Sequence, residues 1–260
     1  MKAKKSLGQN FLKSDKALSQ MIDVSDICAD DIVLEIGPGK GALTEKLLKL
    51  ASKVIAIEKD RELIPVLSEK FSEYIKDGRL DLIEGDILEF NEEKLKFYKK
   101  DYKLIANIPY YITGAIVRKF LESNFQPNSM TLLVQKEVAE RIVAKDGKES
   151  ILSLSVKVYG IPKFVAKVSK RYFSPEPKVD SAIIYISNIN KDNFKKVEEK
   201  IFFEVIKTAF GQKRKTLLNN FEGHEKVREF LLKHDFDLKI RAEDLKIGDF
   251  LALADSFPQK

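Results

Sequence analysis

The sequence predicts an α/β fold in which a mostly parallel sheet is covered by helices and followed by a small all-helical C-terminal domain. From residue 30 to about residue 135, short aliphatic and β-branched runs alternate with longer amphipathic stretches. A glycine-rich turn directly follows the first of these runs, and beyond residue 189 apolar residues recur at helical spacing instead. Strands that alternate with helices form right-handed crossovers, which produce parallel sheets with both faces covered.

The predicted elements follow one another in a regular order. Strands are expected at residues 32–36, 54–57, 80–83, 102–106, 131–134 and 182–186, and helices at residues 42–50 and 62–74. The segment 150–158 fits both a helix and a strand, because its apolar residues only partly follow a period of two. A polar stretch at residues 188–193 ends the pattern, so we expect two domains, residues 1–188 and residues 189–260.

Composition restricts the function. The 260 residues carry 46 Lys and Arg against 40 Asp and Glu, a formal net charge of +6, which permits an anionic partner without requiring one. A single cysteine, Cys28, excludes an intramolecular disulfide framework, and with two histidines it leaves few ligands for zinc. The first residues lack the apolar segment of a signal peptide, and no apolar run approaches the ~20 residues of a membrane span. We therefore expect a cytoplasmic protein without a structural metal.

A glycine-rich turn follows the first predicted strand in the stretch EIGPGKGALT. Gly37, Gly39 and Gly41 stand at every second position before a helix, where glycine lets a ligand approach the backbone and the start of the helix offers unpaired amides. The dinucleotide fingerprint has the spacing G-x-G-x-x-G, whereas this turn reads G-x-G-x-G and is preceded by acidic Glu35. A nicotinamide cofactor is therefore disfavoured.

Acidic residues stand at the ends of the next two predicted strands. Glu58 ends the second strand, where a carboxylate can bind both hydroxyls of a ribose, and Asp86 ends the third. Together with the glycine turn they indicate a nucleoside ligand without a pyrophosphate, and S-adenosylmethionine fits this description. The alternative is an ordinary turn with solvated carboxylates, which would require these features to coincide by chance at successive strand ends of one sheet.

The fourth predicted strand ends in the stretch NIPYYITGAI, residues 107–116. The lone pair of an adenine N6 amine is delocalised into the ring, and two acceptors aimed at its hydrogens expose that lone pair to an electrophilic methyl group. Asn107 can supply a side-chain carbonyl, and the restrained backbone of Pro109 or its neighbour can supply the second. Tyr110 offers a ring on which an extruded base can stack. In isolation the same tetrapeptide would indicate a strand exit with core tyrosines.

These stretches carry a resemblance that covers nearly the whole chain. The chain resembles the KsgA (RsmA) family of small-subunit ribosomal RNA adenine N6-dimethyltransferases. The matching stretches are LGQNFL from residue 7, EIGPGKGALT from residue 35, NIPYYITGAI from residue 107, QKEVAERI from residue 135, FSPEPKVDSA from residue 173 and FGQKRKTLLNN from residue 210. The resemblance implies a Rossmann-like class I methyltransferase fold and a helix at residues 150–158.

The resemblance also implies roles for particular residues. S-adenosylmethionine would be bound in the domain 1–188 by Asn10, Leu12, Gly37, Glu58, Asp86 and Asn107. Asn107, Pro109 and Tyr110 would surround the target amine, and Phe173 would cover the opposite face of the adenine. The sequence alone also allows Phe173 to be an ordinary core residue. The implied enzyme dimethylates two adjacent adenines of small-subunit rRNA and contributes to rRNA processing and ribosome biogenesis.

Basic residues cluster near both ends of the chain. Lys2, Lys4, Lys5 and Lys13 precede the predicted sheet, and Lys213, Arg214 and Lys215 lie in the predicted helical domain. Such residues neutralise phosphates independently of base sequence, so we expect the C-terminal cluster to bind RNA. The alternative for this cluster is the start of a helix with exposed charge. A solvated tail explains the N-terminal lysines equally well. The expected partner is small-subunit rRNA within an immature 30S particle, and the enzyme is expected to be a monomer.

Two other functions share parts of this pattern. A resistance-type methyltransferase of large-subunit rRNA would share QNF and a stretch like NIPY, but PKVDSA and QKRKTLLNN favour the small-subunit enzyme. A noncatalytic RNA- or transcription-associated protein on the same scaffold would not need Glu58, Asp86 and residues 107–110 together.

Overall fold

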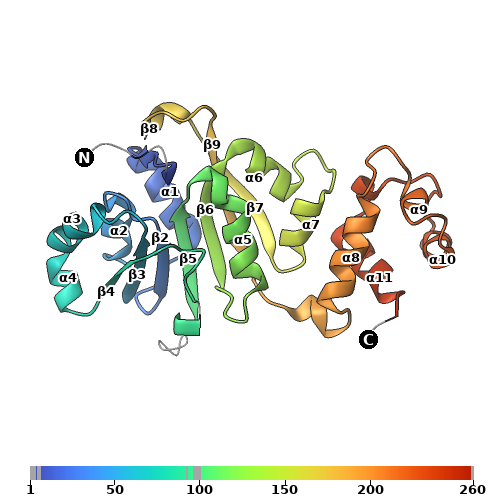
Figure 1. The fold of residues 1–260 in the computed structure, drawn as a ribbon, viewed down its shortest axis with the longest axis horizontal. Coiled ribbons are helices and arrows are strands. Elements are labelled where there is room, and N and C mark those ends of the chain that lie inside the picture. Colours follow the sequence, from blue (N-terminus) through green and yellow to red (C-terminus); the bar gives the residue numbers. More distant parts are fainter. Residues whose placement is uncertain (1–3, 5–6, 92, 96–100, 259–260) are drawn as a thin grey trace. The chain divides into compact units, whose positions relative to one another are not determined.

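The computed structural model of the protein describes residues 4, 7–91, 93–95 and 101–258 (Figure 1). By their internal contacts the residues form two compact units. The sheet unit comprises residues 1–139 and 162–189, and the helical unit comprises residues 140–161 and 190–260. The segment 140–161 thus groups with the C-terminal residues. The division into domains 1–188 and 189–260 stays a prediction.

A seven-stranded sheet forms the centre of the sheet unit, with the strand order β4-β3-β2-β5-β6-β9-β7. Its strands are β2 (Ile32–Ile36), β3 (Lys53–Glu58), β4 (Leu80–Glu84), β5 (Tyr102–Asn107), β6 (Ser129–Gln135), β7 (Ile161–Val168) and β9 (Ser181–Ser187). Strands β2 to β6 pair in parallel, and β9 runs antiparallel to β6. Because β2 lies between β3 and β5, the strand order reverses there, which opens a ligand crevice at the carboxyl ends of these strands.

Helices connect the strands as the alternating pattern predicts. They are α1 (Asp15–Ser25), α2 (Ala42–Leu47), α3 (Leu63–Lys70), α4 (Ser72–Lys76), α5 (Thr113–Glu122) and α6 (Lys136–Val143), with short 3-10 helices η3 (Tyr110–Ile112) and η4 (Lys170–Tyr172). Strand β2 is buried along its whole length and β3 along nearly all of it, as expected for strands covered on both faces. A two-stranded antiparallel sheet joins β1 (Phe11–Leu12) to β8 (Phe173–Ser174).

The helix predicted at residues 62–74 is two helices, α3 and α4, separated at Phe71. Phe71 is buried, and a Cβ atom added to Gly41 would come within 2.5 Å of its ring. The break in the helix therefore places this ring against the glycine turn, a contact between segments that helical periodicity does not reveal.

The segment 150–158, for which the sequence allowed both a helix and a strand, forms helix α7 (Ile151–Lys157). A reciprocal capping box fixes its start: the Ser150 hydroxyl accepts from the backbone N–H of Ser153, and the Ser153 hydroxyl accepts from the backbone N–H of Ser150. The helix implied by the family resemblance is thus confirmed.

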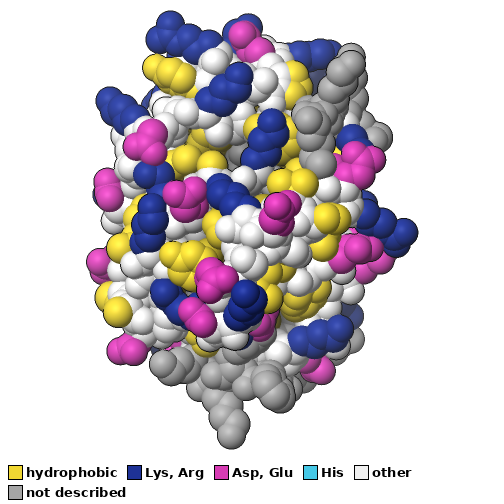
Figure 2. All heavy atoms as spheres, turned by 90° about the vertical axis from the view of Figure 1, so that its left-hand side faces the viewer, with side chains coloured by type: hydrophobic (Ala, Val, Ile, Leu, Met, Phe, Trp, Pro, Cys, Tyr) yellow, Lys and Arg dark blue, Asp and Glu magenta, His cyan; other side chains and the backbone are white. Residues whose placement is uncertain are grey.

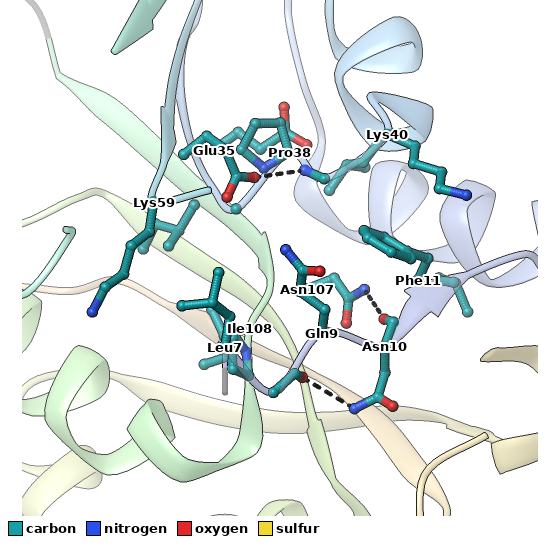
Figure 3. Close-up of a pocket in the computed structure, with 18 of the residues that line it drawn as sticks. Leu7, Gln9, Asn10, Phe11, Glu35, Pro38, Lys40, Lys59, Asn107 and Ile108 are labelled. Atoms are coloured by element: carbon teal, nitrogen blue, oxygen red, sulfur yellow. Dashed lines mark hydrogen bonds between the residues drawn. The ribbon is translucent and has the colours of Figure 1, made fainter. Parts of the chain in front are cut away.

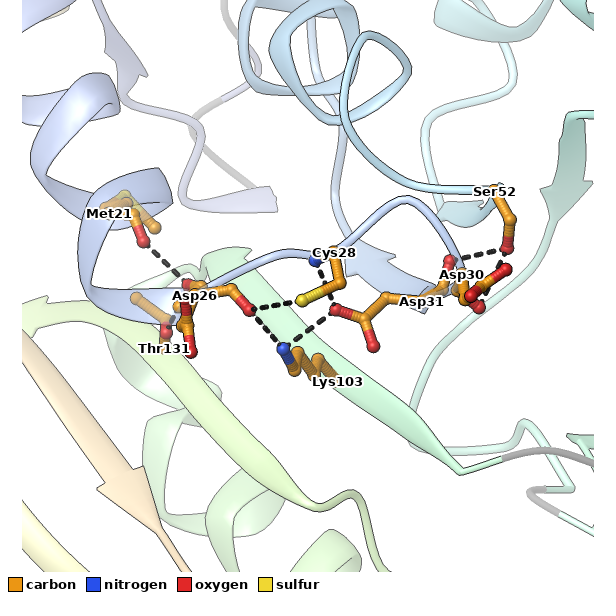
Figure 4. A network of polar contacts seen from close by, with 9 residues as sticks. Met21, Asp26, Cys28, Asp30, Asp31, Ser52, Lys103 and Thr131 are labelled. Carbon is orange, nitrogen blue, oxygen red and sulfur yellow. Dashed lines mark hydrogen bonds and ion pairs between the residues drawn. The ribbon is translucent and has the colours of Figure 1, made fainter.

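Figure 4 shows a polar network at the amino ends of the parallel strands. The Lys103 ammonium group in β5 donates to the Asp31 carboxylate (2.8 Å), which also accepts from the backbone N–H of Cys28 (2.7 Å). The Ser52 hydroxyl donates to the Asp31 carbonyl at 2.7 Å. These contacts join the loop before β2 to the starts of β3 and β5, so this edge of the sheet has a structural role.

The helical unit packs short helices around aromatic residues. Its elements after α7 are η5 (Asp192–Lys195), α8 (Glu199–Ala209), α9 (Leu217–Asn220), α10 (Glu225–Lys233), η6 (Ala242–Asp244) and α11 (Ile247–Asp255). Phe202 in α8 and Phe250 in α11 are fully buried. This part of the chain is all helical, as predicted. None of the helices in the described ranges is long and apolar enough to cross a membrane.

Candidate active site

A pocket of about 410 Å³ opens in the sheet unit at the carboxyl ends of the parallel strands (Figure 3). The structure places in its lining every residue that was predicted to bind the cofactor or the adenine: Asn10, Leu12, Gly37, Glu58, Asp86, Asn107, Pro109, Tyr110 and Phe173. They come from β1, the glycine turn, the ends of β3 to β5 and β8. Residues far apart in the sequence thus meet at one edge of the sheet.

All three glycines of the turn adopt left-handed backbone angles, with φ of 66° at Gly37, 59° at Gly39 and 77° at Gly41. A Cβ atom on Gly37 would meet no atom within 4 Å and so would project into open space, whereas one on Gly39 would come within 3.1 Å of the Phe11 ring. Gly37 therefore leaves backbone exposed to a ligand, and Gly39 lets the N-terminal segment approach closely.

Glu58, at the end of β3, is fixed beside this turn. Its side chain is 6% exposed, and its two carboxylate oxygens accept from the backbone N–H groups of Gly39 (3.0 Å) and Asp60 (2.8 Å). Burial raises the pKa of Glu58, and these two hydrogen bonds oppose that rise. The carboxylate is thus held at the pocket wall with further lone pairs to accept from a ligand.

Glu35 is a pocket residue for which the sequence suggested no role. It is 1% exposed, and neither of its carboxyl oxygens has a hydrogen-bond partner among the described residues. Burial raises its pKa to about 8, interactions with the side chain and backbone of Thr44 oppose the rise, and the neighbouring charge of Glu58 adds to it. The carboxyl group is therefore mostly protonated at neutral pH, and its oxygens are shielded from the open part of the pocket.

Asp86 lies two residues beyond the end of β4 and is paired. Its carboxylate accepts from the Lys59 ammonium group at 2.6 Å and from the backbone N–H of Leu88 at 2.9 Å. Lys59 holds the pKa of Asp86 below its usual value. Lys59 also lines the pocket (Figure 3), and the sequence reasoning missed it because lysine after a strand is usually a solvated charge.

Asp60 anchors the N-terminal segment to the loop after β3. It is 2% exposed, and its carboxylate accepts from the Lys4 ammonium group and from the Gln9 amide, both at 2.7 Å. Lys4 also pairs with Glu62 at 2.9 Å. The charge of Lys4 is therefore used within the protein, and neither of the two sequence interpretations, an RNA contact or a solvated tail, describes this lysine.

Asn107 ends β5 and faces the N-terminal segment. Its amide nitrogen donates to the Asn10 carbonyl at 3.4 Å, as Figure 3 shows. The Asn10 side chain in turn donates to the Gly8 carbonyl at 3.2 Å. Because the nitrogen end of the Asn107 amide is used in this way, its carbonyl end remains to accept a hydrogen bond.

Two of the aromatic residues in the lining, Tyr110 and Phe173, were predicted to hold the adenine. Tyr110 is half-buried, and its hydroxyl group lies 2.6 Å from the Ser181 hydroxyl in β9. Phe173 is buried, pairs with Leu12 across the β1–β8 ladder and belongs both to the pocket lining and to the hydrophobic core. Phe173 is therefore a core residue that also lines the pocket, and its position over the adenine stays a prediction. Ser181 belongs to the stretch PKVDSA, but nothing in the sequence indicated a role for it.

The predicted RNA-binding residues lie in the helical unit. Lys213, Arg214 and Lys215 are exposed in the turn between α8 and α9, and none of them forms an ion pair with the described residues. Three adjacent unpaired cations make a local positive patch. Lys2 and Lys5 of the N-terminal cluster lie outside the described residues.

The strand order, the glycine turn after β2 and the acidic and amide residues at the strand ends together define a Rossmann-like methyltransferase. A family model described as ribosomal RNA adenine dimethylase matches residues 1–259. The chain belongs to this family of methyltransferase enzymes. The predicted fold class, family and dimethyltransferase activity are thereby confirmed.

Three similar proteins illustrate this membership. The chain is 47% identical over 219 residues to the ribosomal RNA small subunit methyltransferase A of Dehalococcoides mccartyi strain CBDB1. The matched region covers 84% of this chain and 74% of that protein. A dimethyladenosine transferase from Plasmodium falciparum superposes with a TM-score of 0.77 at 29% identity, over 94% of this chain and 95% of that one. The 23S rRNA methyltransferase ErmE superposes with a TM-score of 0.78 over 95% and 99% of the two chains, but its 24% identity supports the fold alone.

Proposed function

We propose that this enzyme transfers methyl groups from S-adenosylmethionine to the N6 amines of two adjacent adenines in small-subunit rRNA, within an immature 30S particle. The observation that carries the proposal is the meeting of Asn107, Pro109 and Tyr110 with the glycine turn and Glu58 in one pocket. The relative at 47% identity is named as a small-subunit enzyme, which favours this substrate over large-subunit rRNA. A noncatalytic binder would not need the pocket.

The residues of the pocket fit S-adenosylmethionine. Gly37 leaves room for a ligand at the backbone, and Glu58 has lone pairs for ribose hydroxyls. When bound, the cofactor supplies an electrophilic methyl group. We assign its binding to Asn10, Leu12, Gly37, Glu58, Asp86 and Asn107.

The adenine amine would be oriented by two carbonyl groups. The Asn107 side chain supplies one, because its nitrogen already donates to Asn10. The Pro109 carbonyl already accepts from the backbone N–H of Ile112 at 3.2 Å, so the neighbouring carbonyl of Ile108, which also lines the pocket, is the better second acceptor. Both acceptors stabilise the positive charge that develops on the nitrogen during attack. The proton leaves afterwards, so no general base is required.

The rings of Tyr110 and Phe173 would hold the adenine between them. Stacking of a base on an aromatic side chain is worth about 1 to 3 kcal/mol, which offsets part of the cost of extruding the base from the RNA. Phe173 is suited to this role because its pairing with Leu12 restrains its backbone.

One assay tests the proposed function. A labelled methyl donor is offered with naked rRNA, immature small subunits and large subunits, and the products are digested and analysed for dimethyladenosine. We expect dimethyladenosine in the small-subunit samples. Label confined to large subunits would support the resistance-type alternative, and the absence of transfer to every RNA would support a noncatalytic binder.

If Glu58 binds the ribose, its removal should lower the affinities for S-adenosylmethionine and S-adenosylhomocysteine equally. Glu58→Ala should weaken S-adenosylmethionine and S-adenosylhomocysteine by about 1.5 to 3 kcal/mol each, because both contain the same ribose and hydrogen bonds to a charged group have this strength. Titration calorimetry measures both affinities. Glu69→Ala, an exposed change on α3, is the control, and unchanged affinities in Glu58→Ala would contradict the assignment.

The patch in the helical unit predicts a change in salt dependence. Replacing Lys213, Arg214 and Lys215 by Glu should weaken RNA or subunit binding and flatten the plot of log affinity against log salt concentration. Each lost phosphate contact lowers the slope by roughly 0.7 to 0.9. Affinity for S-adenosylmethionine should not change, because screening removes the effect of distant exposed charges.

A second triple variant controls for net charge. Lys49, Lys76 and Lys195 already pair with carboxylates, at 3.4, 3.1 and 2.8 Å. Figure 2 shows the face on the side of α3 and α4, where acidic and basic side chains are mixed. Replacing these three lysines by Glu makes the same change in net charge. An equal loss of slope in both triple variants would show that the patch has no specific role.

A further inference from the structure

Two adjacent residues at the start of β9 contact both segments that carry the aromatic rings of the pocket. The Ser181 hydroxyl lies 2.6 Å from the Tyr110 hydroxyl, and Ser181 is fully buried. The Asp180 carboxylate accepts from the backbone N–H of Lys170 at 3.0 Å. Lys170 begins η4, the short helix that leads directly into Phe173.

The topology of the sheet explains why these residues reach both rings. Because β9 runs antiparallel to β6, its start lies beside the end of β6, with Ser181 opposite Gln135. The Asp180 carbonyl closes this end by accepting from the backbone N–H of Lys136 at 3.0 Å. On the other side of β6, the parallel strand β5 ends next to the segment that carries Tyr110. The start of β9 is therefore a fixed point on the carboxyl edge of the sheet.

Each contact restrains a different degree of freedom. The hydroxyl of a half-buried tyrosine needs a partner, and a partner that cannot move fixes the direction of the ring axis. Asp180 restrains the backbone before Phe173, and its second oxygen pairs with Lys167 of β7 at 2.7 Å. The contact with Lys170 sets the position of η4, because the backbone of Asp180 is itself held by the Lys136 N–H.

We propose that Asp180 and Ser181 are positioning residues that set the separation and orientation of the Tyr110 and Phe173 rings, between which the target adenine enters. The proposal rests on the proposed function, because it gives a purpose to a pair of rings assigned to the adenine. It also gives a role to Asp180 and Ser181 of the stretch PKVDSA, to which we assign no contact with the cofactor or the adenine.

A double-mutant cycle tests the serine. Ser181→Ala and Tyr110→Phe remove the same hydrogen bond from opposite ends, so each should lower kcat/KM for rRNA methylation by about two- to tenfold, the effect of one neutral hydrogen bond. The double variant should be no worse than either single variant, because only one bond is lost. If Ser181→Ala does not fold, Tyr110→Phe still breaks the bond while keeping the ring. Affinity for S-adenosylhomocysteine should remain that of the wild type.

Three variants test the aspartate. Asp180→Ala removes the acceptor for the Lys170 N–H and should lower kcat/KM, whereas Asp180→Asn keeps an acceptor oxygen and should retain most of the activity. Lys167→Met removes only the ion pair, and we expect it to leave methyl transfer unchanged. If Asp180→Asn and Lys167→Met lower kcat/KM equally, the activity depends on the ion pair and not on the contact with the Lys170 N–H. That result would overturn this part of the proposal.

The remaining outcomes separate this inference from the proposed function. Dimethyladenosine formed by the wild type establishes the proposed function by itself. If the wild type is active and the effects of Ser181→Ala and Tyr110→Phe multiply, or Ser181→Ala is fully active, the positioning role is wrong. Loss of S-adenosylhomocysteine binding in Ser181→Ala would also overturn it, because the residue would then act on the cofactor.

Discussion

Asn107→Ala is expected to reduce methyl transfer to rRNA by about 100-fold or more, the typical cost of removing one group that stabilises charge in a transition state. The side-chain carbonyl of Asn107 is the acceptor assigned to the adenine amine, and alanine offers none. The fold should remain intact, because the only described hydrogen bond of the side chain is a 3.4 Å contact to Asn10. Single-turnover transfer of a labelled methyl group measures the loss.

The matched control is Asn124→Ala. Asn124 is exposed between α5 and β6, at the opposite edge of the sheet from the pocket, so its removal should leave turnover unchanged. Weaker cofactor binding in Asn107→Ala is compatible with the assignment, because the side chain also contacts the N-terminal segment. Turnover close to that of the wild type is not, and would remove Asn107 from the reaction.

Glu35→Gln is expected to make the free energy of unfolding less dependent on pH in the protein without bound nucleoside. Burial raises the pKa of Glu35 from 4.5 to about 8, so in this range the folded protein holds a proton that the unfolded chain has released. The contribution of Glu35 to the free energy of unfolding is complete below pH 4.5. It falls as the pH rises from 4.5 through 8, by up to ~1.4 kcal/mol per pH unit. Glutamine is neutral throughout and avoids this loss.

Urea unfolding at several pH values between 5 and 9 measures the effect. The wild type should lose stability relative to Glu35→Gln as the pH rises, with the difference levelling off above about pH 8. Glu45→Gln is the control, because Lys70 lowers the pKa of Glu45 and its contribution therefore changes only below the ordinary range of a glutamate. Parallel pH profiles for the wild type and Glu35→Gln would mean that Glu35 is ionised in the folded protein.

The sequence predicted much of the sheet and of the pocket. Strands were expected within one or two residues of β2 to β6 and β9, because their aliphatic runs are short and bounded by turn residues. The residues assigned to the cofactor and the adenine all line one pocket, and Glu58, Asp86 and Asn107 do so because the carboxyl ends of parallel strands meet at one edge. The assignment of Asn107 and Glu58 to that edge therefore required only their positions at strand ends.

The partners of these residues were not predictable from the sequence. Lys59 pairs with Asp86, Lys4 with Asp60, and Tyr110 with Ser181, and each pair joins segments that lie far apart in the chain. A lysine or serine that makes such a contact has the same local pattern as one exposed to solvent. The break between α3 and α4 is similar, because it depends on the contact of Phe71 with Gly41.

The sequence by itself determined the type of fold and placed Glu58 and Asn107 at the edge of the sheet that holds the pocket, since periodicity and strand-end positions are local properties of the chain. Only the tertiary structure decided which charges are already neutralised, that the carboxyl group of Glu35 is buried, and that Asp180 and Ser181 contact the segments of both rings. Burial and hydrogen bonding depend on which distant segments surround a side chain, and the antiparallel return of β9 beside β6 sets those neighbours here.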